Sequence, residues 1–276
     1  MAGPLSVVVV GAHPDDCEIV AGGLTVRLRQ AGHRVTYITT TNGDAGHQAM
    51  DREALARRRA AEARRVAEVL DVEYLVMDNH DGCLEATLAV REALIRLLRR
   101  ADADLVITHP LDDYHPDHRN TARSVIDTAF MLCVPLCVPD TPPLRKSTAY
   151  CHIAKAPQAD ALNIVVPVTD QQEVKLRALH QNTSQIYEWL PWVQRLDVTV
   201  PDDEAGRIEY LREWTRPRLD ARRKAYAEVL ASKGHRPDDP ASPYHHIETF
   251  AAARQGFPLT CSNVRGFFPF DDLVVF

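Results

Sequence analysis

The first half of the chain alternates between short apolar runs and longer amphipathic stretches, and this alternation restricts the fold more than any other feature. The apolar runs predict buried strands over residues 5–10, 35–40, 73–77 and 105–108. The amphipathic stretches predict helices over residues 18–30, 51–70, 87–100 and about 115–130. Such alternation is typical of βαβ units, whose right-handed crossovers place helices on both faces of a sheet. We therefore expect an α/β fold with a Rossmann-like, mainly parallel sheet.

The pattern changes in the second half, where four prolines fall within residues 135–143. Beyond them we expect strands over 148–154 and 164–168, and helices over 170–181 and 203–231, the last broken by Pro217. The C-terminal stretch has no clear period. The proline-rich stretch is too short to mark a boundary in a chain of 276 residues. We expect a single domain over 1–276, with an α/β core over about 1–170 and a C-terminal elaboration over about 171–276.

The composition narrows the class of protein. Lys and Arg number 32 and Asp and Glu 38, so the formal net charge is -6, which argues against a general nucleic-acid binder. The six cysteines are spread out without a Cys-x-x-Cys pair, which fits reduced thiols. No secretory leader is visible, and no stretch reaches the roughly 18 apolar residues that span a bilayer. We expect a cytoplasmic protein that binds neither nucleic acid nor membrane, and a homo-oligomer stays open.

A first polar cluster directly follows the first predicted strand. Residues 11–18 read Gly-Ala-His-Pro-Asp-Asp-Cys-Glu, so His13, Asp15 and Asp16 lie where open α/β sheets bind ligands. Capping of the following helix would need only one aspartate and would leave the histidine unexplained. A dinucleotide loop is disfavoured, because Gly-x-Gly-x-x-Gly is absent and carboxylates repel a pyrophosphate.

A second polar cluster follows the strand predicted over 105–108. Residues 112–118 read Asp-Asp-Tyr-His-Pro-Asp-His. His115 and His118 are three residues apart and share a face if a helix starts there. One histidine in this place could be a core or capping group, but two of them with Asp117 in between are poorly explained by packing alone.

Both clusters follow strands, so both can reach one cleft. A catalytic zinc site takes three His or carboxylate ligands and leaves a position for water, and His13, Asp16 and His118 would supply them. Such an ion lowers the pKa of its water towards about 7. Asp15 is then a candidate proton acceptor, and His115, as a cation or as a hydrogen-bond donor, could stabilise an oxyanion. These parts predict metal-assisted hydrolysis, although two histidines and one carboxylate also suit iron(II).

The two motifs together, at residues 12–18 and 115–118, resemble those of the PIG-L/LmbE family of zinc-dependent N-acetylglucosaminyl deacetylases. The resemblance is clear to about residue 130 and faint to the C-terminus. It implies a metal-dependent N-deacetylase, that is, a hydrolase of linear amide C–N bonds. Its substrate would be a small N-acetylglucosamine-type amino sugar or a conjugate of one, and its cofactor Zn²⁺, with another divalent metal open.

The resemblance also implies roles for individual residues. The implied zinc ligands are His13, Asp16 and His118. Asp15 would be the general base and acid, His115 would polarise the carbonyl or stabilise the oxyanion, and Asp117 would orient a neighbouring histidine. One departure is that Asp113 stands where some members carry a tyrosine.

Two further positions are candidates for substrate binding. The predicted helix 51–70 resembles the family's Arg-x-x-Glu helix through Arg59 and Glu62, which lie near one helical stripe. Arg59 could bind the sugar, or the two residues could form a buried structural pair. Asp81 lies in a loop that resembles one of the family, and it could bind a sugar hydroxyl or belong to a plain Asp-Gly turn. The segment 244–250 carries His245, His246 and Glu248, which could also reach the site.

The sequence alone leaves three functions open. The retained ligands and base favour the deacetylase. The alternatives are a metal-dependent amidase that acts on another N-acyl metabolite and a non-catalytic α/β protein that binds a metabolite. Metal analysis together with acetate release from N-acetylglucosamine conjugates distinguishes them.

Overall fold

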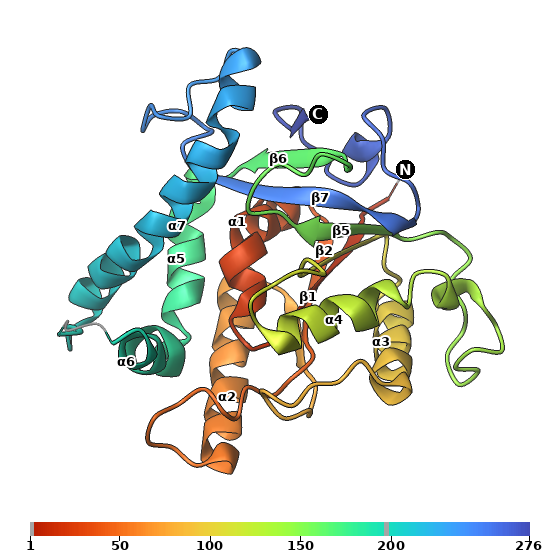
Figure 1. The fold of residues 1–276 in the computed structure, drawn as a ribbon, viewed down its shortest axis with the longest axis horizontal. Helices are drawn as coiled ribbons and strands as arrows, with labels where there is room; N and C mark the ends of the chain where they lie inside the picture. Colours follow the sequence, from red (N-terminus) through yellow and green to blue (C-terminus); the bar gives the residue numbers. More distant parts are fainter. Residues whose placement is uncertain (1–2, 196–198) are drawn as a thin grey trace.

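The structure is a computed structural model that describes residues 3–195 and 199–276. Its described strands form one eight-stranded mixed sheet with the order β3-β2-β1-β4-β5-β7-β6-β8. The five strands from β3 to β5 are mutually parallel, and β7, β6 and β8 extend the sheet in antiparallel pairs (Figure 1). The strands are β1 (Ser6–Gly11), β2 (Arg34–Thr39), β3 (Glu73–Val76), β4 (Leu105–Thr108), β5 (Ala149–Ile153), β6 (Asn163–Pro167), β7 (Ile247–Gly256) and β8 (Val274–Val275).

Helices cover both faces of this sheet. They are α1 (Asp16–Gln30), α2 (Arg52–Leu70), α3 (Leu88–Arg100), α4 (Pro116–Ile126), α5 (Gln172–His180), α6 (Leu190–Val193) and α7 (Glu204–Ser232). A short π-helical segment, Ser184–Trp189, precedes α6. Figure 1 shows α5, α6 and α7 together on the side of the molecule away from α3. None of the helices in the described ranges combines the length and the apolar character that crossing a membrane needs.

The alternating side chains of β1 explain why both faces need helices. Val7 and Val9 belong to a core that includes residues of α1 and α2, whereas Val8 and Val10 belong to a second core with residues of α3 and α4. Successive strand residues point to opposite faces, and burying each valine contributes about 1.5–3 kcal/mol. A strand that is apolar at every position is therefore stable only between two layers of helices, and the predicted α/β fold is confirmed.

The second half differs from the sequence analysis at two places. The stretch 247–256, for which no element was predicted, forms the long strand β7 and inserts between β5 and β6. The predicted break at Pro217 was wrong, because the helix α7 continues through this residue. Proline removes one backbone hydrogen bond, but Leu211, Tyr226 and Leu230 are buried on either side of it and hold the helix in place.

The register of the parallel strands brings the two polar clusters together. Val10 of β1 pairs with Thr108 of β4, so both strands end at the same edge of the sheet. The loop after β1 leads directly into α1. The loop after β4 leads into α4, whose N-cap is His115. The helices α1 and α4 start at the same sheet edge and therefore hold the two motifs close to each other.

Candidate metal centre

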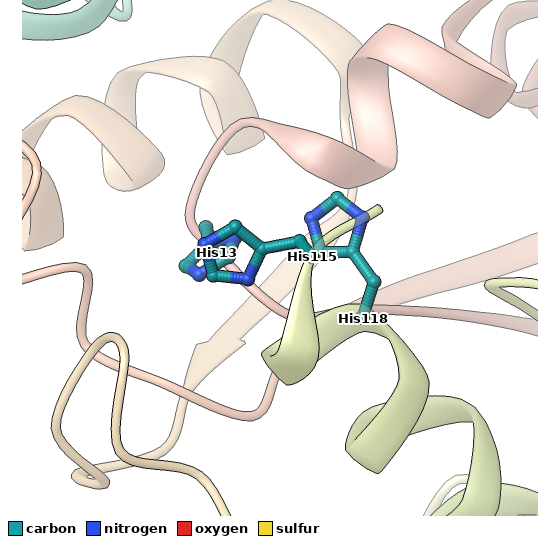
Figure 2. Close-up of side chains that lie close together, drawn as sticks. All are labelled: His13, His115 and His118. Carbon is teal, nitrogen blue, oxygen red and sulfur yellow. The ribbon is translucent and has the colours of Figure 1, made fainter. Parts of the chain in front are cut away.

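Three imidazole rings from the two clusters lie next to one another at this edge. Figure 2 shows His13, from the loop before α1, beside His115 and His118 at the start of α4. The ring centroid of His13 lies 4.7 Å from that of His115 and 5.3 Å from that of His118. The prediction that the two clusters reach one cleft is therefore confirmed.

The carboxylate of Asp16 lies between two of these rings. Its Oδ2 atom is 3.4 Å from Nδ1 of His13 and 3.5 Å from Nε2 of His118. Three overlapping sets of side chains have candidate ligand atoms within 4.8 Å of one another: Asp16 with His109 and His118, His13 with His115 and His118, and His13 with Asp81, His115 and Asp117. Imidazole nitrogens with a carboxylate are the donors of zinc and of other transition-metal ions. The residues present fit a divalent metal ion.

Three histidines face Oδ2 of Asp16, since Nε2 of His109 also lies 3.2 Å from it. His13 and His118 each have a second carboxylate at the other ring nitrogen. Nδ1 of His118 is 3.1 Å from Asp113, and Nε2 of His13 is 3.2 Å from Asp117. Asp117 is itself fixed, since it accepts hydrogen bonds from the backbone N–H groups of Gly82 and Leu84. Carboxylates in this position fix the tautomer and the orientation of metal-binding histidines. The carboxylate of Asp117 thus contacts His13 of the other motif, while its backbone N–H donates to its sequence neighbour His115.

The pKa values of His118 and His13 shift in opposite directions. Burial lowers the pKa of His118 to about 4, which keeps its ring neutral. Burial also lowers the pKa of His13, but its hydrogen bonds to Asp117, Asp16 and Asp81 outweigh this effect and raise the pKa above the ordinary value. Burial raises the pKa of Asp16, and the nearby His118 and His109 more than reverse that shift. A cluster of this many buried carboxylates favours a cation.

Asp15 adjoins this cluster and points to a different partner. Its Oδ2 lies 3.3 Å from Nη2 of Arg59, a side chain that is only 2% exposed. Burial raises the pKa of Asp15 to about 7, although the Arg59 guanidinium opposes the shift. Its backbone φ is 156°, a conformation rare outside glycine, and such residues concentrate at functional sites.

His115 is oriented by its position as the N-cap of α4. Its Nδ1 accepts a hydrogen bond from the backbone N–H of Asp117. Burial and the neighbouring His13 lower its pKa. A neutral ring that accepts at Nδ1 carries its proton on Nε2. Of the two states expected for His115, the structure therefore favours the neutral hydrogen-bond donor over the cation.

The two sugar-binding candidates line the same cavity, which has a volume of about 820 Å³. Arg59 does not pair with Glu62: it donates to the carbonyls of Gly43 and Pro14 and approaches Asp15 and Asp81. Glu62 instead accepts hydrogen bonds from Thr183 and Ser184. The alternative of a buried Arg59–Glu62 pair was therefore wrong.

Asp81 approaches the centre as well as the following turn. Its Oδ1 lies 3.2 Å from Nε2 of His13. The next residue, Gly82, has a φ of 78°, so the Asp-Gly turn expected here also exists. The plain turn and the contact with the site are compatible, because the backbone makes the turn and the side chain points inwards.

His109 is the residue of the centre that the sequence argument missed. Its ring stacks on that of His118 with centroids 3.9 Å apart, and its Nε2 accepts a hydrogen bond from the backbone N–H of Ala12. Its only signal was its place directly after β4. The segment 244–250 lies away from the cavity wall: Glu248 bonds to Lys175 and to the backbone of α1, and neither His245 nor His246 is among the residues lining the cavity.

Comparison with known proteins agrees with the motifs. Residues 8–129 match the model of the PIG-L family, described as GlcNAc-PI de-N-acetylase. The diacetylchitobiose deacetylase of Thermococcus kodakarensis is 29% identical over 207 residues, which make up 69% of this chain and 75% of that protein.

Solved structures agree with the fold. The N,N'-diacetylchitobiose deacetylase of Pyrococcus horikoshii has a TM-score of 0.68 at 22% identity, over 90% of this chain and 83% of that chain. The 4-carboxy-2-hydroxymuconate hydratase GalB of Pseudomonas putida has a TM-score of 0.62 at 18% identity, over 93% of this chain and 98% of that chain. Since a hydratase shares the fold, the chemistry must be argued from the site.

Proposed function

We propose that the protein is a zinc-dependent hydrolase of N-acetylated amino sugars, and the match of residues 8–129 to the PIG-L family supports this proposal. It removes the acetyl group from an N-acetylglucosamine-type sugar or its conjugate. The observation that carries the proposal is the pair of adjacent carboxylates: Asp16 lies between His13 and His118, while Asp15 turns to Arg59. One carboxylate is thus available to a metal ion and the other to a proton.

His13, Asp16 and His118 would hold the ion. The donor set, the orienting carboxylates Asp113 and Asp117 and the neutral state of His118 all support this assignment. His109 lies beside this set, with its Nε2 3.2 Å from Oδ2 of Asp16, and is a further candidate ligand. When bound, a zinc ion in this position would polarise a water molecule and the acetyl carbonyl.

Asp15 would take a proton from the attacking water and then give it to the departing nitrogen. The water oxygen forms a bond to the acetyl carbon, and the bond from that carbon to the sugar nitrogen breaks. The products are acetate and the free amine. Arg59 holds the Asp15 carboxylate in one orientation, as their 3.3 Å contact indicates.

His115 would donate a hydrogen bond to the carbonyl oxygen as negative charge develops there. Its Nδ1 is occupied by the N–H of Asp117, which leaves Nε2 as the donor. A donor placed in advance at the developing oxyanion stabilises the transition state more than the substrate.

Arg59 and Asp81 would contact the sugar itself. Both are buried and line the cavity, and both are close enough to Asp15 and His13 to couple sugar position to the reacting groups. A cavity of about 820 Å³ is within the range of small-molecule sites, roughly 300–1,000 Å³.

The experiment is a panel of N-acylated compounds with the purified protein before and after chelation and zinc replacement. Acetate released from N-acetylated amino sugars, only with metal present, supports the proposal. Release of other acids from other N-acyl metabolites would point to the broader amidase, and binding of sugars without acid release would point to a non-catalytic protein.

A further inference from the structure

The wall of the cavity that α7 supplies is basic. Trp214, Arg218 and Arg222 follow one another at intervals of four residues, which places them on one stripe of the helix. All three line the cavity that also contains the histidine cluster. Figure 1 shows α7 as the outermost long helix on this side of the molecule.

Neither arginine has a carboxylate partner among the described residues. Arg218 stacks on the ring of Trp214 at 3.9 Å, and its one hydrogen bond goes to the Trp214 carbonyl at 3.4 Å. The buried Nε atom of Arg222 has no hydrogen-bond partner within residues 3–195 and 199–276. Other arginines of α7 differ, because Arg212 and Arg216 pair with glutamates on the surface.

The buried carboxylate of Glu248, whose charge acts on Arg222, has other partners. Glu248 accepts hydrogen bonds from Nζ of Lys175 at 2.6 Å and from the backbone N–H groups of Gly23 and Leu24 at 2.8 and 2.7 Å. Both guanidinium groups stay protonated. Arg222 is half-buried and Arg218 is exposed. Two cations thus line the cavity without a carboxylate partner among the described residues, so both are available to an anionic ligand.

The charges of the cavity are therefore segregated. Carboxylates and imidazoles come from the loops after β1, β3 and β4, and the unpaired cations come from α7. Guanidinium groups match the oxygens of carboxylates and phosphates, and the field of a paired set attracts such ligands.

We propose that Arg218 and Arg222 form an anion subsite and that the sugar substrate of this chain carries an anionic group, a carboxylate or a phosphate ester. This inference rests on the proposed deacetylase function and names its substrate class. The acetamide lies at the histidines and the anion at α7, where the Arg218 guanidinium lies over the ring of Trp214.

The first test compares substrates on the zinc-loaded protein. Acetate release is measured with methyl N-acetylglucosaminide as the neutral reference and with N-acetylglucosamine 1-phosphate, the 6-phosphate and the glycoside of glycolic acid as anionic forms. At least one anionic form is expected to exceed the neutral one in kcat/KM by roughly tenfold or more, the scale of a charge-assisted hydrogen bond. Comparison of the phosphorylated sugars with the glycolic acid glycoside identifies which anion is bound.

Arg218→Gln and Arg222→Gln should reduce this preference to near unity, mainly through KM. Arg216→Gln is the matched control, since Arg216 lies on the same helix but pairs with Glu213 and is not among the residues that line the cavity. Equal kcat/KM for neutral and anionic substrates in the wild type, or a preference that survives both substitutions, would overturn the subsite.

A binding measurement separates this proposal from the deacetylase itself. Inorganic phosphate is titrated into the zinc-loaded protein at constant ionic strength while tryptophan fluorescence is recorded, because Trp214 lies against Arg218. The subsite predicts a saturable change in the wild type and in Arg216→Gln that is lost in Arg218→Gln and Arg222→Gln. If no sugar is deacetylated but this change is present, the function is wrong and the anion site stands; an identical titration in all four proteins refutes the site.

Discussion

The carboxylate of Asp113 lies 3.1 Å from Nδ1 of His118, and the opposite nitrogen of the same ring faces Asp16. Asp113 is almost fully buried, with 3% of its side chain exposed. Its contact is with a candidate metal ligand, so Asp113 supplies an orienting carboxylate to the centre.

Replacing Asp113 should weaken the centre without removing a ligand. We expect Asp113→Ala to lower zinc affinity by roughly 10–100-fold, as for other carboxylates behind metal-binding histidines. Competition with a chromophoric chelator measures this affinity. Asp112→Asn is the control, because Asp112 is the exposed neighbour. Equal affinities in all three proteins would mean that Asp113 does not position His118.

Removing His118 itself should have a larger effect. His118→Ala leaves one imidazole and one carboxylate in the proposed set, too few for a stable three-ligand site. Elemental analysis of the purified variant should find far less than one zinc per chain, while circular dichroism finds a folded protein. Stoichiometric zinc in this variant would show that the ligand assignment is wrong.

Local patterns predicted the parts of the fold that local interactions determine. Apolar runs predict the strand–helix alternation up to α4. Side chains such as Asp51 and Thr87 cap the helices at their N-termini. The two histidine motifs could also be recognised in the sequence, because their residue types are unusual at strand ends. The position of Arg59 on an apolar stripe correctly indicated an inward-facing charge, although its partner was not Glu62.

The sequence did not predict the features that depend on contacts between residues far apart in the chain. The sequence of β7 has three consecutive alanines and no alternation, and it is a strand because β5 and β6 pair with its two edges. His109 is a single histidine outside both motifs, and only the tertiary structure places its ring on that of His118 and its Nε2 3.2 Å from Asp16. Arg218 and Arg222 belong to a helix full of charges, and only the tertiary structure distinguishes them from the paired arginines on the surface.

His115 should affect turnover and not metal content. We expect His115→Ala to lower kcat by roughly 10²–10³, the scale for losing one oxyanion donor. Zinc content is measured on the same preparation and should stay at one per chain. Loss of zinc would make His115 a ligand, which the close set of His13, His115 and His118 allows geometrically. Retained turnover would exclude it from the reaction.

The buried pair of Lys175 and Glu248 should matter for stability. Their atoms are 2.6 Å apart with 5% and 1% of the side chains exposed, and they join α5 to β7. Lys175→Met leaves an unpaired buried carboxylate and should lower the free energy of unfolding by about 3–5 kcal/mol. Urea denaturation measures it, with the exposed Lys233→Met as the control, expected within about 0.5 kcal/mol of wild type.

A double variant tests the reason for that loss. In Lys175→Met/Glu248→Gln the neutral amide oxygen can still accept the backbone N–H groups of α1, so most of the stability should return. If the double variant is as unstable as the single one, the lost packing of the lysine and not the unpaired charge is responsible.

The central claim is that one carboxylate of the adjacent pair serves the metal and the other serves the proton. The most direct test is to measure zinc content and acetate release together for the wild type and for Asp15→Asn, on the best N-acetylated sugar of the panel. We predict one zinc per chain in both proteins and a kcat lower by about 10²–10⁴ in the variant, the range for a general acid–base group. Near-normal turnover by zinc-loaded Asp15→Asn, or loss of its zinc, would contradict this division of roles.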